Sequence, residues 1–97
     1  MPSHHFGNGT FKNELWVAGK RIFEGLERVD VEFTTGGSRD WLIADGNGVI
    51  VKTLSHSAAG WTSIHLPSQG LYGNFSVGFR NTSGGEKVIK QGDVTYG

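Results

Sequence analysis

The chain has 97 residues, 36% of them hydrophobic, with sixteen glycines and no cysteine. This length suits one domain with a modest core, and the lack of cysteine excludes disulfides, thiolate zinc sites and thiol catalysis. Nine basic and nine acidic side chains cancel and are interspersed, which argues against nucleic acid or an anionic membrane as a partner, and no apolar run approaches the roughly 20 residues of a transmembrane helix.

The first nine residues, MPSHHFGNG, have no hydrophobic period and end in the turn dipeptide Asn8-Gly9. We therefore expect a flexible N-terminal arm over residues 1–9, which carries His4 and His5, and a single folded domain over residues 10–97. The sequence leaves open whether this arm is native.

Two strands are expected next. Residues 10–18, TFKNELWVA, are rich in aromatic and branched side chains, which predicts a strand. The clearest pattern covers residues 26–35, where apolar Val29, Val31 and Phe33 alternate with Arg28, Asp30 and Glu32. A helix is the alternative for residues 10–30, but apolar residues at every second position favour strands. Asp30 and Glu32 then lie on the outer face, where charged side chains ordinarily serve solubility.

A hairpin is predicted around residues 45–48, Asp-Gly-Asn-Gly, which separate the apolar runs 41–44 and 49–51. Gly and Asn tolerate the positive φ that tight hairpin turns require. The alternative is a calcium loop, since Asp45 and Asn47 offer oxygen ligands. The further acidic ligands of an EF-hand are missing, which favours a simple turn.

Residues 61–81, WTSIHLPSQGLYGNFSVGFRN, predict two strands joined by a Pro/Ser/Gln/Gly loop. Side chains alternate between the two faces of a strand, so paired strands would share one polar face with aromatic residues at its edge. This face is the candidate ligand-binding surface, and it comprises Trp61, Ser63 and His65 from the first strand and Tyr72, Asn74, Ser76 and Arg80 from the second.

About eight short strands at a spacing of roughly 8–12 residues predict an all-β fold, an antiparallel β-sandwich of Ig-like or jelly-roll-like type. A small β-barrel is the alternative. The apolar positions expected to form the core are Val29, Val31, Phe33, Ile43, Val51, Ile64, Phe75, Val77 and Phe79.

Two segments resemble known families. Residues 41–54, WLIADGNGVIVKTL, look like a hairpin of Ig-like modules in exported bacterial proteins. Residues 66–85, LPSQGLYGNFSVGFRNTSGG, are similar to the closing hairpin of bacterial prepeptidase-type and carbohydrate-binding sandwiches. The resemblance covers about a third of the chain and implies an exported bacterial β-sandwich.

The motifs of common enzyme families are missing. The sequence contains no Gly-x-Ser-x-Gly elbow, no P-loop and no Rossmann fingerprint. Only His56 and His65 lie within the predicted domain, nine residues apart, which is a poor pattern for a metal site. We therefore expect no enzyme activity, no cofactor and no bound metal.

The leading functional hypothesis is an exported, non-enzymatic recognition module that binds glycan at a cell wall or cell surface. Sugars combine apolar C–H faces with hydroxyl groups, and the face with Trp61 and Tyr72 offers aromatic rings beside short polar side chains. No signal peptide is visible, so an exported protein would be the processed form. The alternatives are a secreted bacteriocin-like antimicrobial or toxin and a self-assembling surface protein.

Overall fold

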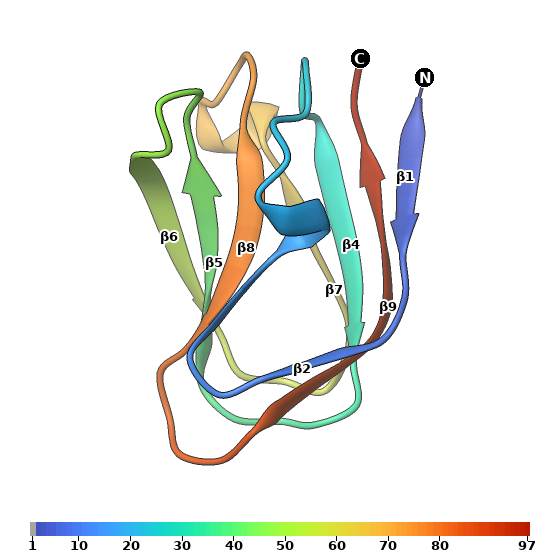
Figure 1. Ribbon diagram of the computed structural model, residues 1–97, viewed down its shortest axis with the longest axis vertical. Coiled ribbons are helices and arrows are strands. Elements are labelled where there is room, and N and C mark those ends of the chain that lie inside the picture. Colours follow the sequence, from blue (N-terminus) through green and yellow to red (C-terminus); the bar gives the residue numbers. More distant parts are fainter. Residues whose placement is uncertain (1) are drawn as a thin grey trace.

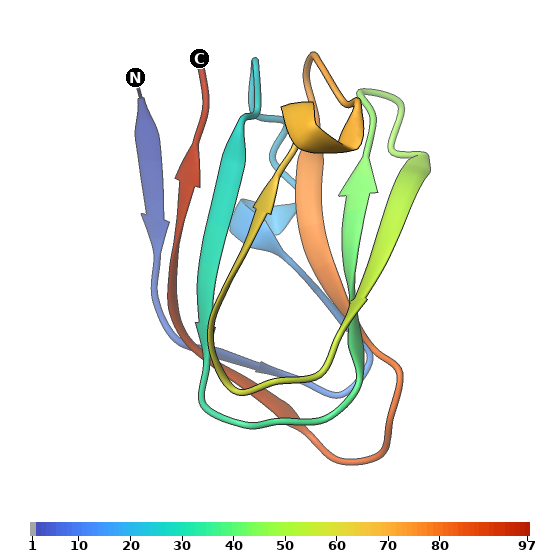
Figure 2. The same cartoon turned by 180° about the vertical axis from the view of Figure 1, so that it is seen from behind.

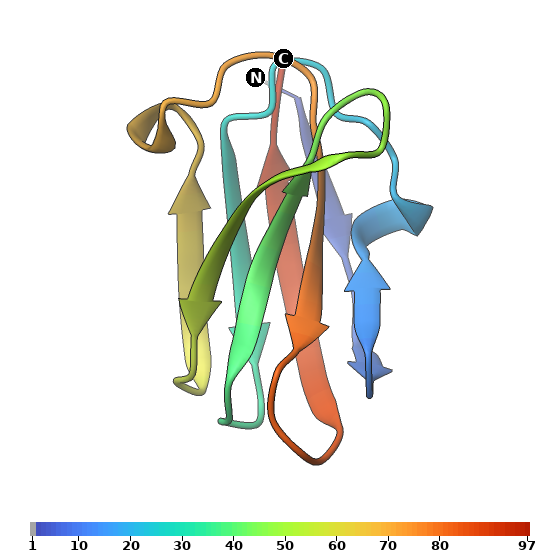
Figure 3. The same ribbon diagram turned by 90° about the vertical axis from the view of Figure 1, so that its left-hand side faces the viewer.

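The protein is a sandwich of two antiparallel β-sheets (Figures 1 and 3). The computed structural model describes residues 2–97. Sheet A has the strand order β1-β9-β4-β7, with β2 also paired to β9, and sheet B has the order β3-β8-β5-β6. Figure 1 shows sheet B on the left and most of sheet A on the right, and Figure 3 looks onto sheet B with sheet A behind it. The expected antiparallel β-sandwich is confirmed.

The strands are short and the described chain contains only single-turn helices. The strands are β1 (Ser3–Phe6), β2 (Gly9–Phe11), β3 (Glu14–Trp16), β4 (Arg28–Phe33), β5 (Arg39–Ala44), β6 (Ile50–His56), β7 (Gly60–His65), β8 (Ser76–Asn81) and β9 (Lys87–Thr95). Two 3-10 turns, η1 (Val17–Gly19) and η2 (Pro67–Gln69), lie between strands. Over residues 2–97, neither turn has the length and apolar character that a bilayer-spanning helix needs.

The core lies between the inner faces of the two sheets. Phe79 of β8 is at its centre, with ring centroids 4.9 Å from Trp41, 5.4 Å from Phe33 and 6.4 Å from Phe11. Eight of the nine predicted core residues are buried as expected, namely Val29, Val31, Phe33, Ile43, Ile64, Phe75, Val77 and Phe79. The two-residue alternation of the strands is sufficient to identify them.

The predicted turn at residues 45–48 is confirmed. Asp45 N–H donates to the Val49 carbonyl at 2.9 Å, and the Gly48 N–H donates to the Asp45 carbonyl at 3.0 Å. The Asp45 carboxylate accepts hydrogen bonds from the backbone N–H groups of Asn47 and Val49. This carboxylate therefore closes the turn between β5 and β6 by bonding its own backbone.

The prediction that Val51 is buried is wrong, because 44% of its surface is exposed. The register shifts between Ile43, which faces Lys52, and Ala44, which faces Ile50. Val51 is therefore the extra residue of a β-bulge in β6, which is the edge strand of sheet B.

The prediction of a flexible arm over residues 1–9 is wrong for residues 3–6. These residues form β1 and pair antiparallel with β9, from Ser3 opposite Thr95 to Phe6 opposite Gly92. The expected boundary at residue 10 is also absent, because β2 begins at Gly9. Met1 lies outside the described residues.

The single strand expected over residues 10–18 is also wrong. The chain forms β2 in sheet A and β3 in sheet B, and then turns through η1. Ala18 and Lys20 adopt positive φ angles of 51° and 69° in this turn. A continuous strand would leave Phe11 and Leu15 unable to reach the core from the two sheets.

The predicted hairpin of residues 61–81 is wrong, because its two strands belong to different sheets. β7 pairs with β4 in sheet A, whereas β8 pairs with β3 and β5 in sheet B. Figure 2 shows η2 and the following segment crossing the end of the sandwich between β7 and β8. Leu66 is buried on one side of this crossing and Phe75 on the other, and their burial holds the segment across the core.

The docking of β1 can be tested at Gly92, where a Cβ atom would lie 2.1 Å from the Phe6 ring. We expect Gly92→Ala to force Phe6 off β9 and to lower the free energy of unfolding by about 1–3 kcal/mol, as overpacking does. Gly46→Ala is the control, because a Cβ there meets nothing within 4 Å. Equal urea unfolding curves for the two variants would contradict the placement of β1.

Candidate functional site

The outer face of sheet A is polar and continuous over four strands. Its side chains are Ser3 and His5 from β1, Gln91, Asp93 and Thr95 from β9, Arg28, Asp30 and Glu32 from β4, and Trp61, Ser63 and His65 from β7. The strand register arranges them in rows across the sheet. We call this surface the polar face.

The middle row of the polar face runs His5, Asp93, Asp30, Ser63. The His5 ring lies 2.8 Å from the Asp93 carboxylate, and the Ser63 hydroxyl donates to Asp30. Arg28 donates to the same Asp30 oxygen at 2.9 Å. Directly opposed carboxylates repel each other, so these partners offset the repulsion between Asp30 and Asp93.

The next row carries Trp61, Glu32 and Gln91. The Gln91 amide donates to the Glu32 carboxylate at 3.0 Å, and both side chains are half-buried. Trp61 is 54% exposed and lies on the edge strand β7. Opposed side chains on paired strands are about 5 Å apart, so an aromatic ring lies beside a fixed carboxylate and amide.

The structure brings together only three of the seven residues predicted from the sequence. Trp61, Ser63 and His65 share the polar face, where the His65 ring lies 2.7 Å from the hydroxyl of Ser68. The other four do not join them. Tyr72 is 76% exposed and lies in the crossing segment that follows His65, at the end of β7 opposite to Trp61.

The remaining three predicted residues lie apart from one another, and within residues 2–97 the buried hydroxyl of Ser76 has no hydrogen-bond partner. The Asn74 side chain accepts a hydrogen bond from the Gly25 N–H. Ser76 is buried in β8, a central strand of sheet B. Arg80 lies on the outer face of sheet B and donates to Glu14 at 3.0 Å. The prediction of one surface shared by β7 and β8 is therefore wrong, because these strands do not pair.

Sequence reasoning missed the partners that β4, β9 and β1 contribute. A signal was present for β4, whose alternation already placed Asp30 and Glu32 on an outward face. Charged side chains at these positions also serve solubility, so the alternation alone does not identify a binding face. Gln91 and Asp93 flank Gly92 with the same two-residue period, but nothing local indicates that β9 lies beside β4.

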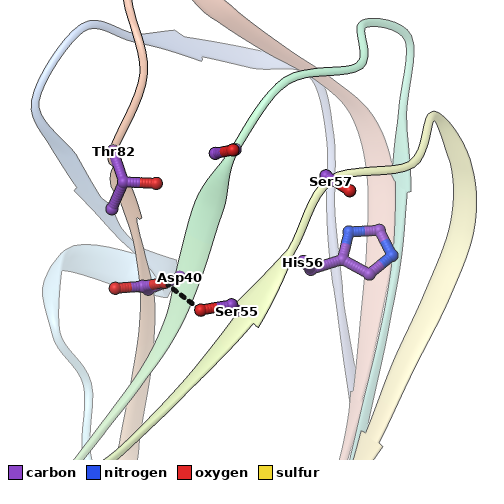
Figure 4. Close-up of a pocket in the computed structure, with 6 residues that line it drawn as sticks. Asp40, Ser55, His56, Ser57 and Thr82 are labelled. Carbon is purple, nitrogen blue, oxygen red and sulfur yellow. Dashed lines mark hydrogen bonds between the residues drawn. The ribbon is translucent and has the colours of Figure 1, made fainter.

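A second candidate region is an open hollow of about 490 Å³ at the end of the sandwich where β5 begins and β6 ends (Figure 4). It is lined by Ser38, Asp40, Ser55, His56, Ser57 and Thr82. The Ser55 hydroxyl donates to the Asp40 carboxylate at 3.1 Å. The hollow therefore offers four hydroxyl groups and one carboxylate.

The hollow contains Ser, His and Asp side chains, but they do not form a catalytic triad. In a triad a carboxylate holds His Nδ1, and Nε2 takes a proton from the serine. Here His56 Nδ1 lies 3.0 Å from the Arg39 guanidinium, which can only donate. Nδ1 is therefore the acceptor, and the proton of the neutral ring is on Nε2. A general base would need an unprotonated Nε2 to accept the proton of the serine.

The ring of His56 is held in its neutral form. Burial, and secondly the positive charge of Arg39, lower the pKa of His56 below its ordinary value of 6.5. Burial also lowers the pKa of Arg39. Among residues 2–97, no group of three or more His, Asp or Glu side chains is placed to hold a metal ion.

No protein-family model matches this chain, and a search of curated proteins finds no match. The proposals below therefore rest on the geometry of the polar face and of the hollow.

The contact between His56 and Arg39 predicts a pH dependence of stability. Unfolded His56 takes up a proton near pH 6.5, whereas folded His56 does so only at lower pH. The contribution of this contact to stability is therefore fully present above pH 6.5. It is lost as the pH falls from 6.5 through the lower pKa of the folded ring. The variant His56→Asn keeps an acceptor for Arg39 and cannot titrate. We expect the stability advantage of the unmodified protein over this variant to shrink from about pH 8 to about pH 5 in urea unfolding. A pH-independent difference would contradict the assignment.

Proposed function

We propose that the protein is a non-enzymatic recognition module that binds glycan on the polar face of sheet A. The observation that carries the proposal is Trp61, a large aromatic side chain exposed in the same row as Glu32 and Gln91. A sugar ring stacked on the indole would place its equatorial hydroxyls near the carboxylate and amide. Aromatic stacking provides most of the affinity, and the polar pair provides specificity.

The fixed geometry of the polar pair supports this function. The Gln91 amide is already bound to Glu32, so the free lone pairs of Glu32 and the second N–H of Gln91 keep defined directions. Binding then orders few side chains, which lowers its entropic cost. The middle row adds Asp30, Asp93 and His5 as further hydroxyl partners for a longer glycan.

The setting of this activity is part of the same proposal. We propose that the protein is exported and acts at a cell wall or cell surface, where polysaccharide is the abundant ligand. The polar face is the open outer side of a sheet, and an open face suits an extended or insoluble polymer better than a free monosaccharide.

Binding to insoluble cellulose, chitin, xylan and peptidoglycan tests the proposal by pull-down. We expect the unmodified protein to be retained by at least one polymer. Trp61→Ala should weaken that binding roughly thirtyfold, because a desolvated aromatic anchor contributes about 2 kcal/mol or more. Trp61→Tyr should keep most of the affinity, since it preserves an aromatic ring.

Tyr72→Ala is the matched control. Tyr72 is even more exposed than Trp61 but lies away from the polar face, so its removal should leave retention unchanged. Circular dichroism of all variants must show an intact fold. Retention of folded Trp61→Ala at the original affinity, or no retention by any of the polymers, would refute glycan binding on this face.

One observation favours a second candidate function, a self-assembling surface protein. β6 is an edge strand. Val49, which precedes it, and Ile50 and Val51, which begin it, are exposed over 58%, 36% and 44% of their surfaces. An exposed apolar edge offers unpaired backbone groups to a second copy of the chain.

Self-assembly predicts a mass that rises with protein concentration in sedimentation equilibrium. Val51→Lys should return the protein to a monomer, because a charged residue at the edge opposes strand pairing. Thr10→Lys adds the same charge at an exposed position of β2, in the other sheet, and should leave the association unchanged. A monomer at every concentration would exclude this function.

A further inference from the structure

Asp40 is the one charged group that lines the hollow at the end of the sandwich. It is half-buried, and the Ser55 hydroxyl is its hydrogen-bond partner within residues 2–97. An ionised carboxylate has about four acceptor positions. Most of the acceptor capacity of Asp40 is therefore unused, in a space that the hydroxyls of Ser38, Ser57 and Thr82 also line.

The nearest cation by register does not neutralise Asp40. Arg80 faces Asp40 across β8 and β5, but its Nε donates to Glu14 on the far side. The ion pairs found within residues 2–97 are those of His5 with Asp93, Arg28 with Asp30, and Arg80 with Glu14. A half-buried carboxylate without an ion-pair partner, beside several hydroxyls, favours a positively charged ligand.

The chemistry of the lining narrows the kind of cation. A metal ion would need three or more strong ligands, and no such group exists in the described part of the chain. His56 cannot serve, because Arg39 occupies its Nδ1 and the proton is on Nε2. A quaternary ammonium is recognised by aromatic cages, and the lining contains no Trp, Tyr or Phe.

We propose that this hollow binds a small amino alcohol or amino sugar, with Asp40 as the partner of its primary ammonium and the surrounding hydroxyls as partners of its hydroxyl groups. The ammonium donates to the free oxygen of Asp40, and the serine and threonine hydroxyls contact the ligand's oxygens. A volume of about 490 Å³ accommodates a monosaccharide. The site lies on sheet B and its loops and does not depend on glycan binding at the polar face.

Four probes separate the chemical requirements in an NMR titration at neutral pH. Glucosamine and ethanolamine carry both an ammonium and a hydroxyl, glucose has no charge, and choline has a charge without N–H donors. We expect glucosamine and ethanolamine to shift the amide signals of Ser38, Asp40, Ser55 and Thr82. Glucose and choline should bind about ten- to hundredfold more weakly, the loss expected for one hydrogen bond to a charged group.

Asp40→Asn keeps the shape and the bond from Ser55 but removes the charge, and it should weaken glucosamine binding about ten- to hundredfold. Glu24→Gln, at an exposed position outside both the hollow and the polar face, is the matched control and should not change it. Four outcomes would overturn the proposal: no binding of glucosamine, equal binding of glucose, equal binding of choline, or unchanged binding by folded Asp40→Asn. The probe comparison uses the unmodified protein, so it decides the matter even if Asp40→Asn fails to fold.

Discussion

The end of the sandwich that carries the hollow depends on the buried guanidinium of Arg39, which is 1% exposed. Within residues 2–97 it has no carboxylate partner. It donates instead to the carbonyls of Gly37, at 3.0 Å, and Ala58, and to the ring of His56. Burying a charge is costly unless it is hydrogen-bonded. Because the Arg39 Nε has no partner within residues 2–97, the bonds from its two terminal nitrogens are what offset this cost. These contacts therefore join the loop after β4 to the loop before β7, and they oppose any separation of the two.

We call these hydrogen bonds of Arg39 the Arg39 clamp. The positions of both candidate sites follow from it. Ser38 is adjacent to Gly37, Ser57 is adjacent to Ala58, and both serines line the hollow. Trp61 follows the Ala58 loop by three residues, so the clamp also sets where β7 begins beside β4. The Arg39 guanidinium lies 3.5 Å from the centroid of the Phe33 ring, which connects the loop network to the aromatic core.

The outer faces of the two sheets differ in kind, and this difference explains why only sheet A offers a broad polar surface. On sheet B, Trp16 lies against Gly78, where a Cβ atom would be 2.7 Å from its ring. Lys20 lies over the same ring at 4.4 Å. Leu42 and Ala44 are buried although they point outward. Much of sheet B is thus covered by its own side chains.

Local sequence patterns predicted those parts of the fold that depend on neighbouring residues. The alternation of Val29, Val31 and Phe33 identified β4, and the Asp-Gly-Asn-Gly turn identified the β5–β6 hairpin. The same period, extended back from Trp41 and Ile43, places Arg39 on the inward face. That signal was available, but no motif indicates a buried arginine.

The features that the sequence did not predict depend on contacts between distant segments. β1 has no hydrophobic period and is held by pairing with β9, where Phe6 fits against Gly92. The β7–β8 segment has turn residues typical of a hairpin, but burial of Leu66 and Phe75 carries it across the core. Four of the seven candidate site residues were misplaced for this reason.

The central claim is that glycan lies on the polar face, beside Trp61. An NMR titration of the isotope-labelled protein with a soluble oligosaccharide of the polymer that retains it tests this most directly. The account predicts shifts in the Trp61 indole N–H, the Gln91 side-chain amide and the backbone amides of β4 and β7. Shifts confined to β6 or to the Tyr72 segment, with the Trp61 and Gln91 side-chain signals unmoved, would contradict it.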